Sequence, residues 1–190
     1  MVPTDGSTSA LDVAPRSRTK YDLVIGFGTV ILAALAVADL GFGARGLIAA
    51  LLLAVLAVLS VIDLERRILP DRIVLPAAAV ILALQLVFFT DQWLEWIVAS
   101  VGGAAFLLLL VAVYRAGLGM GDVKLMLLLG AGLGKSAVLA FFLGSLAAAA
   151  FGIVLLVRHG SSARKMAIPF GPFLACGAAV AVFVSDSTLF

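Results

Sequence analysis

The stretch Leu51-Leu-Leu-Ala-Val-Leu-Ala-Val-Leu-Ser-Val-Ile-Asp63-Leu-Glu-Arg-Arg-Ile-Leu-Pro70-Asp71 ends an apolar run in charged residues and then leads into a second apolar run. Asp63 directly follows the first run, which places it at or just inside a membrane boundary. Pro70 cannot extend a preceding helix and therefore fixes a turn. Asp71 is suited to cap the helix that follows. The stretch predicts two membrane helices joined by a short charged loop.

The composition of the whole chain is that of a membrane protein. Of 190 residues, 64% are hydrophobic and 13% are charged, and the mean hydropathy is +1.23. Soluble domains are roughly 45–50% apolar and about 25% charged. So few polar residues could not cover the surface of a water-soluble fold. The composition argues against a soluble enzyme, a disordered chain and a nucleic-acid-binding module.

Seven apolar segments follow one another along the chain. They run at roughly 23–41, 46–62, 73–90, 93–114, 123–134, 136–157 and 167–185. A membrane helix needs about 20 apolar residues, so the fifth segment is too short to span alone and is expected to be half-buried or tilted among its neighbours. We predict an all-α, polytopic transmembrane bundle, with a polar tail at 1–20 and a single transmembrane domain at 21–190.

The basic residues predict the orientation of this bundle. If the N-terminus is cytoplasmic, Arg45 and Lys135 are the only two of the 13 Lys and Arg residues on the outer side. Cytoplasmic loops carry an excess of Lys and Arg, so the N-terminus is expected inside and the C-terminus outside. A competing interpretation takes the run from Leu23 to Ala36-Val37-Ala38 as a cleavable signal peptide. The remaining topology is the same in both.

Residue counts argue against several other kinds of site. Cys176 and His159 are the only residues of their types, so no internal disulfide is expected, and the usual zinc ligand sets are missing. Neither a metal ion nor a cofactor is expected. The glycine-rich stretch before Lys135 resembles a phosphate-binding loop, but Leu129 stands where that motif requires glycine. A helix break between two apolar segments is the better interpretation.

A second charged cluster begins the fifth segment, in the sequence Gly117-Leu-Gly119-Met-Gly121-Asp122-Val-Lys124. Alternating glycines allow backbone conformations and close approaches that other residues resist. They bring Asp122 to the start of an apolar helix, where an ionisable side chain is costly and is a candidate for function. Lys124 either tunes the nearby carboxylates or snorkels to the interface.

Asp63 and Asp122 are predicted to form a pair. Two membrane crossings separate them, so both fall at the cytoplasmic side. Two close carboxylates in a low dielectric share a proton, and one then activates water while the other donates to a substrate carbonyl. Because Asp122 begins a helix and Asp63 ends one, the helix dipoles favour Asp122 as the anion.

Each acidic residue also has a purely structural interpretation. Asp63 could be a solvated loop residue paired with Arg66 or Arg67, and Asp122 could be only a helix N-cap. For Asp71 capping is favoured over catalysis. The glycine pattern and the matching topology favour a functional pair over these separate interpretations.

At these residues the chain resembles the prepilin peptidases, the type IV leader peptidase family of GxGD intramembrane aspartyl proteases. Asp63–Asp71 matches the family pattern D-x-x-x-x-x-(I/L)-P-D, and Gly119–Leu125 matches G-x-G-D-x-K-(L/F). Ile168–Leu174 resembles the late segment P-F-G-P-(F/Y)-L. The resemblance covers roughly residues 45–190.

The resemblance implies that Asp63 and Asp122 are catalytic and that the transmembrane domain is a peptidase domain. The residues expected to support them are Gly119, Gly121, Lys124, Pro70, Asp71, Pro169 and Gly171. The implied reaction removes a short basic leader from type IV prepilins or related pseudopilins, at the cytoplasmic face of a prokaryotic inner membrane. The expected partners are this precursor protein and membrane lipid, without nucleic acid, and the oligomeric state stays open.

Several alternatives remain beside this interpretation. Longer family members carry a cytoplasmic insert with two C-x-x-C pairs that is associated with N-methylation, and since Cys176 is the one cysteine here, methyltransferase activity is not expected. Archaeal preflagellin peptidases share the same two aspartates. A non-proteolytic transporter or membrane subunit is the third alternative, although a transporter would place its acids near the bilayer midplane.

Overall fold

The computed structural model describes residues 43–66, 68–114, 119–160 and 169–188, with side chains up to Val184, and a few isolated residues between 28 and 38. All regular structure in these ranges is helical. The predicted all-α class is therefore confirmed for the described part of the chain. The expected tail at 1–20, most of the segment at 23–41 and most of the possible cleavage site at 36–38 lie outside the described residues.

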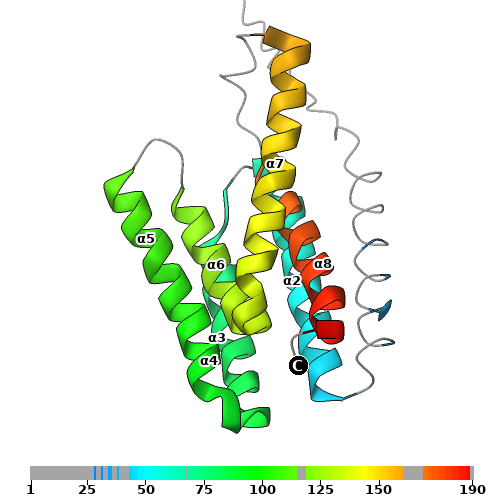
Figure 1. Cartoon of the computed structure of the whole chain (residues 1–190), viewed down its shortest axis with the longest axis vertical. Helices are drawn as coiled ribbons and strands as arrows, with labels where there is room; N and C mark the ends of the chain where they lie inside the picture. Colours follow the sequence, from blue (N-terminus) through cyan, green and yellow to red (C-terminus); the bar gives the residue numbers. More distant parts are fainter. Residues whose placement is uncertain are drawn as a thin grey trace, which may run out of the picture.

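The helices follow one another with short connections. Their order is α2 (Ala44–Arg66), α3 (Asp71–Phe88), the short turn η1 (Thr90–Gln92), α4 (Trp93–Ile97), the π-helical turn η2 (Val98–Gly102), α5 (Gly103–Val113), α6 (Met120–Leu133), the turn η3 (Gly134–Ser136), α7 (Ala137–His159) and α8 (Gly171–Thr188). Each predicted segment from residue 46 onward overlaps at least one of these helices. The chain reverses direction at η3, so that α6 and α7 run side by side in opposite directions (Figure 1).

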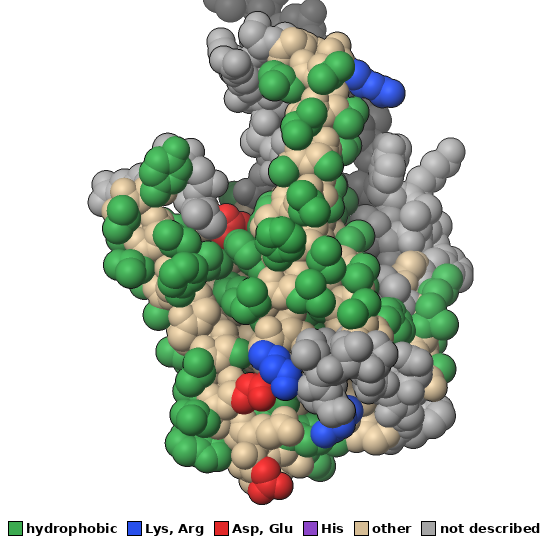
Figure 2. Space-filling view, in the orientation of Figure 1, with side chains coloured by type: hydrophobic (Ala, Val, Ile, Leu, Met, Phe, Trp, Pro, Cys, Tyr) green, Lys and Arg blue, Asp and Glu red, His purple; other side chains and the backbone are tan. Residues whose placement is uncertain are grey.

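Four helical stretches of the described chain are long and apolar enough to cross a membrane. They are Ala44–Arg66, Asp71–Phe88, Thr90–Val113 and Met120–His159, and Gly171–Val184 is a shorter apolar helix. Large hydrophobic side chains cover much of the outer surface (Figure 2). These are the helices of a membrane protein, while the count of seven segments and the orientation of the termini stay predictions.

Helix α6 forms the centre of the bundle, in contact with α2, α3, α5, α7 and α8. Eight of its 14 residues are buried. An apolar helix without a polar face belongs in a core, which explains why the short fifth segment is enclosed. Its place among its neighbours agrees with the half-buried or tilted helix that we expected from its length.

A close helix contact holds α8 against α7. A Cβ atom on Gly177 would lie 2.3 Å from the backbone oxygen of Ala140 and 2.7 Å from the backbone nitrogen of Gly144. No side chain fits there, so the two backbones touch, as small residues allow between membrane helices. This contact positions the N-terminal end of α8, where Gly171 lies.

Two polar side chains connect the central helix to its neighbours inside the bundle. The hydroxyl group of Ser100 donates to the backbone oxygen of Leu127 at 2.9 Å, and the Nε2 atom of Gln85 donates to the backbone oxygen of Gly132 at 3.2 Å. Both side chains are buried. In an apolar environment such groups are costly unless they are hydrogen-bonded, so these bonds favour one arrangement of α3, η2 and α6.

Candidate active site

Asp63 lies in the last turn of α2 and is only 7% exposed. Its Oδ2 atom accepts a hydrogen bond of 2.7 Å from the backbone N–H of Gly171, the first residue of α8. A Cβ atom at Gly171 would lie 3.1 Å from this oxygen and 3.2 Å from the Cβ atom of Asp63. Glycine therefore allows the start of α8 to lie directly against the carboxylate. The interpretation of Asp63 as a solvated loop acid is wrong, because the side chain is buried.

Asp122 lies in the first turn of α6, three residues after the N-cap residue Gly119. Its Oδ2 atom accepts a hydrogen bond of 3.0 Å from the backbone N–H of Gly119, and its own N–H donates to the oxygen of Gly119 at 3.1 Å. Asp122 is thus not the N-cap residue itself. Its carboxylate instead satisfies one of the free N–H groups at the beginning of the helix.

Gly121 brings the loop between α2 and α3 against the start of α6. A Cβ atom at this position would lie 2.9 Å from the Cδ1 atom of Leu69. Leu69 is a site residue that the sequence analysis missed, although its position before Pro70 in the family pattern was a usable signal. The contact keeps the two charged clusters of the chain together.

The two carboxylates lie at the same end of the bundle, where the loop before α3 contacts the start of α6. Each accepts a backbone N–H from the start of a helix, Asp122 from the beginning of α6 and Asp63 from the beginning of α8. From the sequence, a helix N-terminus is expected beside Asp122 alone. Since α8 supplies a second one, helix dipoles no longer separate the two carboxylates in the way that we expected.

The ion pair between Lys124 and Asp71 joins α6 to the start of α3. The expected capping role of Asp71 is wrong, because Pro70 is the N-cap residue and no side-chain bond caps α3. The Asp71 side chain is 56% exposed and that of Lys124 is 23% exposed. An ion pair with this exposure contributes little stability, so we assign it a role in orienting α6.

The structure brings most of the predicted site residues to one end of the bundle. The contacts described above involve Asp63, Asp122, Gly119, Gly121, Lys124, Asp71 and Gly171. Pro70 precedes α3 in an extended conformation, with φ −73°, and Pro169 lies two residues before α8. Among the described residues, no group of three or more His, Cys, Asp or Glu side chains could hold a metal ion.

Comparison with known proteins identifies the family. A model of the type IV leader peptidase family matches residues 50–154, which is more than half of the chain and includes both Asp63 and Asp122. This chain belongs to the type IV leader peptidase family. The resemblance drawn from the three sequence motifs is confirmed.

Curated members of the leader peptidase family resemble most of this chain. A prepilin leader peptidase/N-methyltransferase of Aeromonas salmonicida is 38% identical over 152 residues, covering 75% of this chain and 51% of the relative. The protein of the same name from Burkholderia pseudomallei is 34% identical and covers 80% and 51%, and that of Bacillus subtilis is 29% identical and covers 74% and 57%. The chain thus spans about half the length of these relatives. No solved structure matches it.

Proposed function

We propose that this chain is a membrane aspartyl endopeptidase that removes the basic leader from type IV prepilin-like or pseudopilin precursors. The observation that carries the proposal is the arrangement of two carboxylates at one end of the bundle, where Asp63 accepts the backbone N–H of Gly171 and Asp122 accepts that of Gly119. Family membership supports the substrate class. The curated relatives are named for two activities, and the proposal concerns the peptidase alone.

The reaction uses one carboxylate as a base and the other as an acid. The ionised carboxylate takes a proton from water, whose oxygen attacks the carbonyl carbon of the scissile bond, while the protonated carboxyl donates to the carbonyl oxygen. The carbon–nitrogen bond then breaks, and the leaving amine takes a proton from the pair. Because both Asp63 and Asp122 accept a backbone N–H, these two roles are assigned to the pair as a unit.

We place the site at the cytoplasmic face of a prokaryotic inner membrane, with seven segments, the N-terminus inside and the C-terminus outside. Asp63, Arg66 and Arg72 lie around the connection between α2 and α3, whereas Arg45 lies at the other end of α2. The positive-inside rule supports this orientation.

A transporter function is disfavoured by the position of the acids. Asp63 lies three residues before the last residue of α2, and Asp122 is the third residue of α6. Coupling-ion sites in transporters lie near the bilayer midplane on interrupted helices. Two carboxylates at helix ends favour chemistry on a peptide bond near the membrane surface.

The test is co-expression with a tagged type IV prepilin, followed by measurement of leader removal on a gel. Asp63→Asn and Asp122→Asn should each reduce the rate by about 100-fold or more, because removing a positioned acid or base costs 10²–10⁴. Asp91→Asn is the matched control, since Asp91 is an exposed acid in η1. Equal cleavage by the wild type and either site variant, inserted at equal levels, would show that the aspartyl mechanism is wrong.

A further inference from the structure

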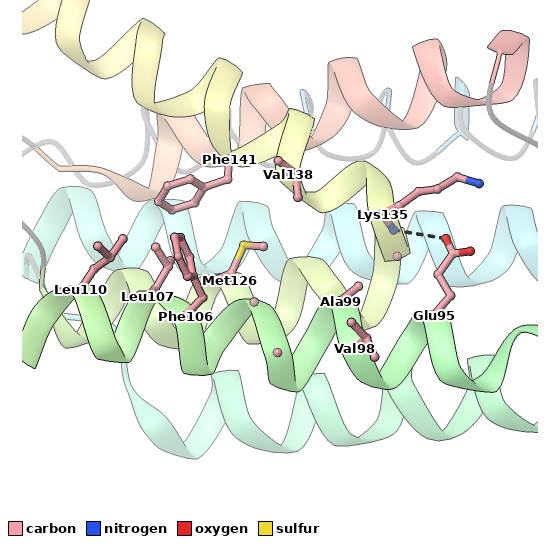
Figure 3. A pocket seen from close by; sticks show the side chains of 13 residues that line it. Glu95, Val98, Ala99, Phe106, Leu107, Leu110, Met126, Lys135, Val138 and Phe141 are labelled. Atoms are coloured by element: carbon pink, nitrogen blue, oxygen red, sulfur yellow. Dashed lines mark hydrogen bonds between the residues drawn. The ribbon is translucent and has the colours of Figure 1, made fainter.

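A lateral groove lies between the stretch α4–η2–α5 on one side and α6 and α7 on the other. Its volume is about 680 Å³. Figure 3 shows Phe106, Leu107 and Leu110 of α5 beside Met126 of α6 and Phe141 of α7. At its far end the backbone N–H of Lys135 donates to Glu95 Oε1 at 3.3 Å. The lining is apolar between these polar residues and the other end of the groove.

One wall of the groove consists of a π-helical turn and the two glycines Gly102 and Gly103. Val98–Gly102 forms the turn η2, a feature that is frequent at functional sites. A Cβ atom on Gly102 would meet only Val98 Cγ1, at 3.6 Å, so the backbone there faces open space. Small residues allow two membrane helices to approach closely, and this wall is therefore suited to a helix as its occupant.

Asp122 does not line the groove, but it lies one helical turn along α6 from a residue that does. Met126 lines the groove and lies four residues after Asp122, and side chains spaced by four share one face of a helix. The distance along the helix is about 6 Å. In Figure 2 an acidic side chain is visible in the hollow between α5 and α7, with hydrophobic side chains on both sides.

An aromatic contact also links a residue of the groove to the segment that binds Asp63. Phe141 lines the groove, and its ring packs edge-to-face on that of Phe170, with ring centroids 6.1 Å apart. Phe170 directly precedes Gly171, whose N–H binds the Asp63 carboxylate. A molecule seated in the groove would therefore lie about one helical turn from Asp122 and against Phe141, whose ring partner Phe170 directly precedes Gly171.

The size of the groove suits one face of a helix. Gly134 and Asp122 are separated by about 18 Å along α6 at 1.5 Å per residue, and a helix of that length and about 10 Å diameter fills about 1,400 Å³. The groove, at about 680 Å³, receives about half of such a helix. The other half would face lipid, as expected for an apolar segment that enters from the bilayer.

We propose that this groove seats the apolar helix of the substrate that follows the scissile bond, a proposal that rests on the proposed function. The helix enters sideways from the bilayer and packs on Gly102, Phe106 and Met126. Its N-terminal end lies at Asp122 and presents the scissile bond to the pair. This is helix-in-groove recognition, in which side chains at i, i+3, i+4 and i+7 are the anchors.

Photo-crosslinking tests the position of the substrate helix. Phe106 lines the groove and Leu109 does not, yet both side chains are 62% exposed on α5, which makes them a matched pair. A benzophenone amino acid is placed at either position in the Asp122→Asn background, with a tagged type IV prepilin co-expressed. We expect at least tenfold more prepilin adduct at 106, mapped to the apolar segment at a helical spacing. Equal adducts at the two positions, or adducts to lipid alone at 106, would overturn the proposal.

A groove-filling variant gives an independent readout. Gly102→Leu should reduce cleavage of the full prepilin at least tenfold through KM, while a short peptide that spans the scissile bond but lacks the apolar segment should be cleaved at the wild-type rate. Ala105→Leu is the control, because Ala105 is exposed on α5 outside the groove. An equal loss on both substrates contradicts the proposal. Failure of the wild type to cleave prepilin removes the proposed function as well, whereas wild-type cleavage with equal adducts overturns the groove alone.

Discussion

The backbone N–H of Gly171 donates a hydrogen bond of 2.7 Å to Asp63 Oδ2, and the two residues are 108 positions apart in the sequence. A buried polar atom is costly unless it is hydrogen-bonded, and this bond provides a partner for the buried oxygen. It also fixes the direction of the carboxylate inside the bundle. Pro172, the second residue of α8, needs no hydrogen-bond partner in the first helical turn, so α8 can begin directly at the carboxylate.

The close contact between Gly171 and Asp63 predicts the effect of adding one methyl group at position 171. Gly171→Ala would place a Cβ atom about 3.1 Å from the carboxylate oxygen, so either Asp63 or the start of α8 must shift. The required shift is a few tenths of an ångström, and because a displacement of about 1 Å at a catalytic group can cost 10²-fold, we expect kcat for leader removal to fall by up to about 10-fold with little change in KM. Steady-state kinetics on purified enzyme is the measurement.

The control for the Gly171→Ala substitution is Gly43→Ala, because a Cβ atom on Gly43 would have no neighbour within 4 Å. It should leave kcat and the melting temperature unchanged. If Gly171→Ala matches the wild type in kcat, the contact between α8 and Asp63 has no importance for the reaction.

The ion pair between Lys124 and Asp71 is predicted to be minor for stability. Both side chains are partly exposed, and such pairs contribute about 0.2–1 kcal/mol. A double-mutant cycle with Lys124→Ala and Asp71→Ala, followed by thermal unfolding in detergent, should give a coupling energy in that range. Each single variant should retain far more leader removal than Asp122→Asn. A coupling energy of several kcal/mol would contradict the minor contribution to stability that we predict for the pair.

The close contact of α7 and α8 predicts that a substitution at Gly177, away from the carboxylates, lowers both stability and activity. Gly177→Ala would place a Cβ atom 2.3 Å from the backbone oxygen of Ala140, and backbone cannot yield as a flexible side chain does. Overpacking of this kind costs about 1–3 kcal/mol, so the melting temperature and leader removal should fall together as Gly171 moves with α8. Cys176→Ala, at the exposed neighbouring position, should change neither quantity.

Local sequence indicated that the two aspartates lie at helix ends, but it did not indicate the contacts that hold them there. Asp63 and Asp122 were predicted because each interrupts an apolar run beside a turn, which is a local signal. The capping role predicted for Asp71 was wrong, because its ion pair with Lys124 depends on the packing of α6 against α3. The bond from Gly171 was missed for the same reason: it forms only when α8 returns to the end of α2. Long-range helix packing left no local periodicity from which these contacts could be inferred.

Cysteine accessibility tests the predicted orientation in the membrane. Cys176 is the one cysteine of the chain, so Cys176→Ala provides a background in which Arg72→Cys or Asp91→Cys is the single thiol. Arg72 and Asp91 are both exposed and lie at opposite ends of α3. Because the positive-inside rule places Arg72 in the cytoplasm, a membrane-impermeant maleimide added to intact cells should label the thiol at 91 and not the thiol at 72. Permeabilised cells should show labelling at both. Labelling at 72 alone in intact cells would invert the topology and place the carboxylates at the outer face.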